Sequence, residues 1–244
     1  MSRQPLGRPL FAASLVGCGI AGLILRNVVV YETFPTSSLT YTIVAVVAGI
    51  LLVGAGVGLL SRFGPMASRV ALTVLLLWDL IFNLPSVFTA PRNEDSWLEL
   101  GMATMVVVGA WLLTGTRRIR LARTIFGLAL IPVGLSHFFF WQITLSLVPS
   151  WIPAPAFWVG LVGVTHLAAG LGVLFGIFPR LAAMLEAGQL VVFAFLVWLP
   201  RVIAKPSVQF NWTEMLGTLL IGGAAWVVSD ALSDRPWLSV GRES

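Results

Sequence analysis

The sequence predicts an all-helical protein that crosses a membrane many times. Of its 244 residues, 58% are hydrophobic and only 10% are charged, and the mean hydropathy is +0.95, which is unlike a soluble domain. The hydrophobic residues fall into long runs, and about 20 apolar residues suffice to span a bilayer as a helix. Because unpaired backbone groups are not tolerated in lipid, each run is expected to be helical. Together these observations exclude a soluble globular enzyme.

Eight apolar stretches are expected to form eight transmembrane helices. In chain order they are residues 9–30, 41–60, 67–88, 98–114, 125–142, 157–178, 181–199 and 213–228. Each is long enough to cross roughly 30 Å at about 1.5 Å per residue. The single cysteine, Cys18, excludes an internal disulfide and a Cys-x-x-Cys relay. Because little chain remains outside these stretches, we expect the function to lie within the helices.

The basic residues predict which way the helices run. Counting Arg and Lys on alternate sides of the eight helices gives eleven on one side and four on the other. Positive charge collects on the cytoplasmic side, so we expect both termini in the cytoplasm and the protein in a bacterial inner (plasma) membrane. The charge therefore indicates topology, and we expect no nucleic-acid partner. The eleven are Arg3, Arg8, Arg62, Arg69, Arg117, Arg118, Arg120, Arg123, Arg180, Arg235 and Arg242, and the four are Arg26, Arg92, Arg201 and Lys205.

The two halves of the chain resemble each other. A shift of 115 residues superposes Arg8, Phe11, Leu15, Gly19, Pro85, Trp97 and Glu99 on Arg123, Phe126, Leu130, Gly134, Pro200, Trp212 and Glu214. We therefore predict two four-helix repeats, residues 1–118 and 119–244, packed side by side. Since each repeat has an even number of helices, both enter the membrane in the same direction, as parallel repeats.

Two histidines are the strongest candidates for a binding site. His137 lies about 14 residues into the fifth predicted helix and His166 about 10 into the sixth, so their depths differ by about 6 Å. Ionisable groups in a membrane usually point into the bundle, and we expect the two rings to face each other. They would bind a ligand or pack as a hydrogen-bonded pair, and haem ligation is the less favoured alternative. The first repeat has Gly22 and Leu52 at the corresponding positions.

An aromatic run follows His137 and leads into a proline-rich loop. The motifs are Ser136-His137-Phe138-Phe139-Phe140-Trp141-Gln142, Val148-Pro149-Ser150-Trp151-Ile152-Pro153-Ala154-Pro155, Gly163-Val164-Thr165-His166 and Phe178-Pro179-Arg180-Leu181-Ala182-Ala183. Over residues 123–206 this pattern resembles the DoxX-like integral membrane proteins. The resemblance implies a small membrane subunit of respiratory or sulfur redox systems, near quinone. It places His137 at the family's His-Phe position and His166 where glutamate is more usual.

We therefore expect an outer-leaflet pocket for a quinone-like apolar molecule. In this interpretation His137 and His166 orient the molecule, Phe138 and Trp141 flank its ring, and His137 donates to a carbonyl oxygen. An interfacial aromatic belt is the structural alternative. We expect no catalysis by this chain alone, but service as the membrane subunit or anchor of a redox enzyme. A small-solute transporter and a non-enzymatic scaffold are the alternative functions.

Buried acidic residues complete the candidate set. Asp79 falls near the midplane of the third predicted helix, where it is either protonated or paired with a cation. We include it among the ligand-binding residues, although its repeat partner is Ala194. Glu186 is expected near the cytoplasmic face, paired with Arg180. No motif predicts a metal site.

Overall fold

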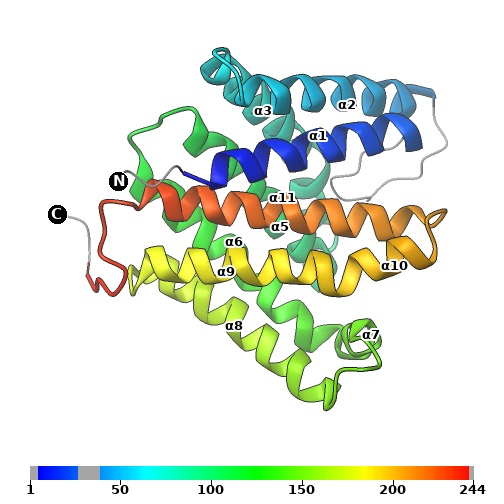
Figure 1. Cartoon of the computed structure of the whole chain (residues 1–244), viewed down its shortest axis with the longest axis vertical. Helices are drawn as coiled ribbons and strands as arrows, with labels where there is room; N and C mark the ends of the chain where they lie inside the picture. Colours follow the sequence, from blue (N-terminus) through cyan, green and yellow to red (C-terminus); the bar gives the residue numbers. More distant parts are fainter. Residues whose placement is uncertain (1–4, 27–38, 242–244) are drawn as a thin grey trace.

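The protein is a bundle of long helices, most of which lie alongside one another (Figure 1). The computed structural model describes residues 5–26 and 39–241. In these residues the helices are α1 (Gly7–Leu25), α2 (Leu39–Leu59), α3 (Gly64–Trp78), α4 (Leu84–Thr89), α5 (Glu94–Leu113), α6 (Ile119–Phe139), α7 (Trp141–Leu147), α8 (Pro155–Phe175), α9 (Pro179–Phe193), α10 (Leu199–Ala204) and α11 (Gln209–Ala231). Two π-helical segments, η1 (Asp79–Asn83) and η2 (Ala194–Trp198), join α3 to α4 and α9 to α10.

Seven helical stretches in the described residues are long and apolar enough to cross a membrane. Two of them, Gly64–Thr89 and Pro179–Ala204, run straight through a π-helical segment. The fold is therefore all-helical and multi-span, as predicted. The seven do not include α11, which packs against α1, α5 and α9 and carries Glu214 and Asp230. Since a helix covered by protein needs less hydropathy than one that faces lipid, a count of eight stays a prediction.

The helices start earlier than the apolar stretches indicated. A proline lies in the first turn of α3, α8 and α9, where its fixed φ favours a helix and its missing N–H leaves no bond unmade. Hydropathy alone overlooks these starts because the first turn is not apolar throughout. Residues 27–30 of the first predicted stretch, and Arg3 and Arg242 of the basic set, lie outside the described residues.

The first helix begins, and the last helix ends, at the same end of the molecule. The backbone N–H of Gly7, which begins α1, donates to Oδ2 of Asp230 near the end of α11 at 2.9 Å, and Figure 1 shows the two elements together there. An even number of crossings gives this arrangement. Which side of the membrane holds this end stays a prediction.

Except for α7, the described elements of the two halves follow one another in the same order. The starts of α3, η1 and α4 are each followed 115 residues later by the starts of α9, η2 and α10. A π-helical segment is rare, and one recurs here at the same place in each half; the division into residues 1–118 and 119–244 stays a prediction. The duplication itself stays a prediction.

The two halves contact each other through helices at both of their ends. α1 packs against α2 and against α11 of the other half, and α6 packs against α8 and against α5 of the other half. At the centre α5 meets α11, where a Cβ on Gly109 would lie 2.7 Å from that of Ala224. Small residues thus let the last helix of each half lie against the other half.

Candidate functional site

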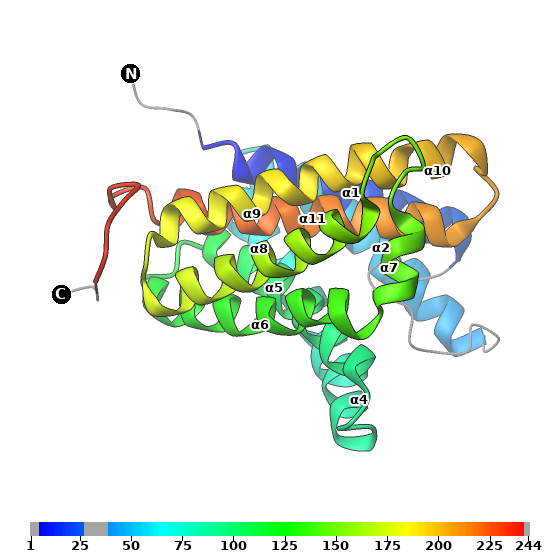
Figure 2. The same ribbon diagram turned by 90° about the horizontal axis from the view of Figure 1, so that it is seen from below.

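Three helices of the second half bring a polar cluster together in their shared interior. Figure 2 shows α8 between α6 and α9. His137 stands near the end of α6 and His166 within α8, and their ring centroids are 5.0 Å apart with the planes tilted by 44°. His166 is 1% exposed, and His137 is half-buried. The structure therefore brings the two rings together, and their role in binding stays a prediction.

Glu186 belongs to this cluster, and its predicted pairing with Arg180 is wrong. Nδ1 of His166 lies 2.8 Å from Oε1 and 3.0 Å from Oε2 of Glu186, and the glutamate is 2% exposed. Arg180 instead donates to the backbone oxygens of Ser233 and Arg235. The error arose because the depth along α9 was counted without knowing which face of the helix turns toward α8.

A chain of hydrogen bonds continues from His166 to two further side chains. Because a carboxylate only accepts, His166 donates from Nδ1 to Glu186 and its Nε2 becomes an acceptor. Nε2 of Gln189 lies 3.0 Å from that atom and donates to it. The hydroxyl of Thr165 in turn donates to Oε1 of Gln189 at 2.6 Å. In this series of hydrogen bonds each donor therefore meets an acceptor. The tautomer of His166 is assigned from these partners.

The backbone hydrogen bond of His137 makes this ring an acceptor toward a ligand, whereas we expected it to be a donor. Nδ1 of His137 lies 3.1 Å from the backbone oxygen of Val133, which accepts only, so Nδ1 carries the proton. In a neutral imidazole the other nitrogen, Nε2, is then an acceptor. His137 is thus prepared to accept from a hydroxyl, whereas donation to a carbonyl oxygen would require a protonated ring.

The two predicted aromatic residues lie at different distances from the histidines. The ring of Phe138 lies so close to α8 that a Cβ on Gly163 would meet it at 2.7 Å, beside the Cβ of His137 at 3.0 Å. Phe138 is also 42% exposed, so its ring forms part of the outer surface at this point. Trp141 begins α7, beyond the end of α6. Phe138 is therefore the aromatic neighbour of the cluster.

The geometry disfavours haem and metal ligation by the histidines. Their centroids lie 5.0 Å apart, at a stacking separation that leaves no space for a macrocycle between them. Both ring nitrogens of His166 also have hydrogen-bond partners. Among residues 5–26 and 39–241, no group of three or more His, Cys, Asp or Glu side chains is arranged to hold a metal ion.

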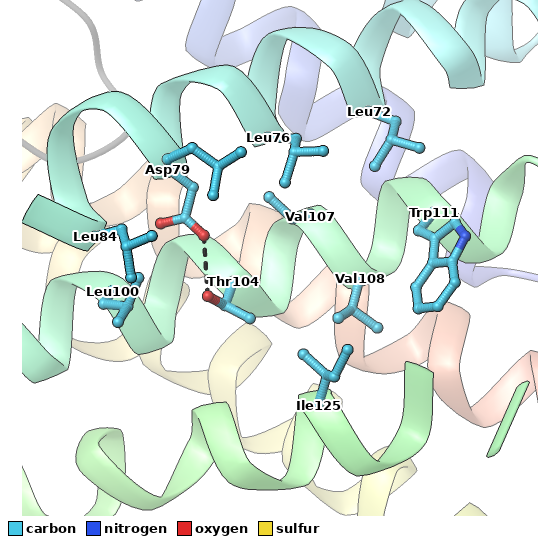
Figure 3. A pocket seen from close by; sticks show the side chains of 11 residues that line it. Leu72, Leu76, Asp79, Leu84, Leu100, Thr104, Val107, Val108, Trp111 and Ile125 are labelled. Carbon is cyan, nitrogen blue, oxygen red and sulfur yellow. Dashed lines mark hydrogen bonds between the residues drawn. The ribbon is translucent and has the colours of Figure 1, made fainter. Parts of the chain in front are cut away.

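Asp79 occupies a second site, in the first half. It is 5% exposed and begins η1. Its Oδ1 accepts from Nδ2 of Asn83 at 3.1 Å, and its Oδ2 accepts from the hydroxyl of Thr104 at 3.0 Å. Asp79 and Thr104 face a cavity of about 430 Å³ between α3, α5 and α6 (Figure 3). The predicted ligand-binding set therefore divides between two places in the fold.

Sequence reasoning missed Gln189 and Thr165, and it misplaced Glu186. Glu186 and Gln189 are three residues apart, and residues at this spacing share one face of a helix. Thr165 directly precedes His166. Two polar residues at i and i+3 of an otherwise apolar helix, and a third next to a buried histidine, were the signal that these side chains point into the bundle.

These features define a multi-span helical membrane protein with a buried histidine–glutamate pair. The family model for DoxX matches residues 119–199, about a third of the chain, from the start of α6 to the start of α10. This part of the chain is therefore similar to the DoxX family, and the matched segment contains every member of the histidine cluster. No curated protein and no solved structure matches the chain.

Proposed function

We propose that the protein is the membrane subunit of a redox system and that His137 binds the head of a quinol in the outer leaflet. One observation carries the proposal: the half-buried His137 ring packs against the buried His166 ring at a tilt and keeps one acceptor nitrogen for a ligand. The membrane is taken to be a bacterial inner membrane with both termini in the cytoplasm, which places the end of α6 on the outer side.

The direction of the hydrogen bonds favours the reduced form of the molecule. A quinol hydroxyl donates to Nε2 of His137, whereas an oxidised quinone offers only acceptors. The half-exposed face of Phe138 supplies apolar surface for the flat ring. Glu186 fixes the proton of His166 on Nδ1, which holds the second ring in place behind the first. In this proposal the electrons pass to a partner redox enzyme, and this chain binds and orients the quinol.

Binding of matched reduced and oxidised probes tests the proposal. Decylubiquinol and decylubiquinone are titrated into the purified protein, and quenching of tryptophan fluorescence gives the dissociation constants. We expect decylubiquinol to bind more tightly, and His137→Ala to weaken its binding about tenfold, equivalent to about 1.4 kcal/mol. The matched control is Asp79→Asn, which removes a polar group from the other site and should leave the constant unchanged. Equal binding by the wild-type protein and His137→Ala would refute the proposal.

Small-solute transport is the second candidate, and the cavity beside Asp79 favours it. Parallel repeats build transport pathways in other membrane proteins. A transporter requires polar groups from both halves along one path, whereas here the His cluster and Asp79 sit between different helices. Saturable uptake of a solute into proteoliposomes would put transport first, and repeated purification with one partner protein and no ligand would favour a scaffold.

A further inference from the structure

We propose that the cavity beside Asp79 binds a lipophilic amine, an apolar body that carries one ammonium group. The proposal is independent of the quinol site, because the cavity shares no residue with the histidine cluster and its ligand carries a positive charge, whereas a quinol is neutral. Three features carry it: the lining of the cavity, the lack of a positively charged partner at its polar end, and its opening toward lipid.

The lining is apolar except at one end. Of the eleven side chains around the cavity, nine are Leu, Val, Ile or Trp, and the other two are Asp79 and Thr104. Figure 3 shows these two side chains joined by a hydrogen bond toward one end of the cavity, with Trp111 at the other. Sites for small ligands are built in this way, with an apolar wall and few polar groups that fix the orientation.

The polar end has more hydrogen-bond acceptors than donors. Both oxygens of Asp79 lie within hydrogen-bond distance of neutral groups, Nδ2 of Asn83 and the hydroxyl of Thr104, so neither contact brings a positive charge to the carboxyl group. Asn83 is fully buried, and its own side-chain oxygen has no donor within the described residues. No Lys, Arg or His of residues 5–26 and 39–241 pairs with Asp79. An ammonium group at this end of the cavity supplies the positive charge that an ionised Asp79 lacks among the described residues, and it donates to the carboxylate.

The cavity opens toward the lipid-facing side of the bundle. Leu76 and Leu80 form part of its wall, and they are 38% and 48% exposed. An apolar amine dissolved in the bilayer therefore reaches the cavity without crossing a polar surface. Asp79 begins the π-helical segment η1, and such segments are frequent at functional sites.

The wall of the cavity on α5 carries larger side chains than the equivalent positions of the second half. On α5 the wall is formed by Val107 and Val108, and the residues 115 positions later on α11 are Gly222 and Gly223. A Cβ on Gly222 would meet the Cβ of Leu190 at 3.3 Å, so α9 lies close against α11. Val107 therefore stands between α5 and α3 at the position where Gly222 lets α9 approach α11 closely.

A matched pair of cage compounds tests the ligand class. The probes are 1-adamantylamine and 1-adamantanol, which share one apolar body and differ in the polar group. Binding to the purified protein is measured by isothermal titration calorimetry. We expect the amine to bind at least about tenfold more tightly than the alcohol. Equal affinity for the two, or no binding of the amine, would overturn the proposal.

Two variants locate the site, and two controls isolate it. Asp79→Asn should weaken amine binding at least about tenfold, whereas Asp95→Asn, which removes an exposed carboxylate from the start of α5, should not. Leu80→Trp should also weaken binding by filling the opening; Leu80 is half-exposed, so this variant folds even if Asp79→Asn does not. Amine binding that survives both variants would overturn the proposal. His137→Ala should leave amine binding unchanged. A failure of the amine proposal can therefore be distinguished from a failure of the quinol proposal.

Discussion

The two halves of the molecule share an order of helices but carry their polar residues between different helices. In the second half, His137, His166 and Glu186 meet between α6, α8 and α9. The first half has Gly22, Leu52 and Ala71 at the corresponding positions along α1, α2 and α3. An apolar core there needs no hydrogen-bond partners.

The relation is reversed between the third and fourth long helices. There the first half carries Asp79 and Thr104 beside a cavity, and the second half has Ala194 and Leu219 115 residues later. A buried polar group in a membrane needs partners or a ligand. The comparison teaches that one helical framework supports either polar site, and that each half contains one of the two.

The largest effect is expected from breaking the His166–Glu186 pair. His166→Leu, which introduces the first-half residue, leaves the Glu186 carboxylate buried without its partner and should lower the free energy of unfolding by about 3–5 kcal/mol. The double variant His166→Leu/Glu186→Ala introduces the first-half residues at both positions of the pair and should recover most of this loss. Unfolding of the detergent-solubilised protein by SDS titration measures both.

The comparison of halves fails if the double variant is less stable than His166→Leu alone. That result would mean that the two side chains contribute independently of each other, so that the second half is not an apolar core with a compensated polar pair.

A smaller effect is expected where small residues bring the halves together. A Cβ on Gly223 would lie 2.8 Å from the Cα of Phe11 and 2.9 Å from its backbone nitrogen, and neither backbone atom can move aside cheaply. Gly223→Ala should therefore lower the free energy of unfolding by about 1–3 kcal/mol. Gly54→Ala is the matched control, because nothing lies within 4 Å of its Cβ position. The close packing between the halves is contradicted if both variants unfold alike.

The smallest effect concerns the end of the hydrogen-bond chain. Thr165→Val removes the hydroxyl that donates to Gln189 and should lower the free energy of unfolding by about 0.6–1.7 kcal/mol, the usual range for such bonds between transmembrane helices. Thr165→Ser keeps the hydroxyl and serves as the control. A loss in Thr165→Ser as large as in Thr165→Val would show that the methyl group, and not the hydrogen bond, is responsible.

Much of the fold was predictable because the bilayer imposes one length on each crossing. Runs of about 20 apolar residues located every long helix, and counting residues along two antiparallel helices placed His137 and His166 at a common depth. The π-helical segments were not predictable, because no hydrophobic pattern distinguishes them from the α-helices that they interrupt.

The site was predicted only in part, because depth does not determine which face of a helix points inward. The position of Glu186 along α9 could be counted from the sequence, but its partner, His166, depends on which face of α9 packs against α8. Asp79 was grouped with the histidines by chemistry alone, whereas the structure places it between other helices. The sequence shows Val107 in the first half where the second half has Gly222, 115 residues later. Val107 is one of the residues that line the cavity.

Photolabelling is the most direct test of the claim that the quinol site lies in the second half. A photoreactive quinol analogue is bound to the purified protein, cross-linked by light, and located by mass spectrometry of the peptides. We expect label in the last turns of α6 and in α8, near His137 and Phe138, and its loss when excess decylubiquinol competes. Label concentrated in η1 and α5 beside Asp79, or label that decylubiquinol does not displace, would contradict the account.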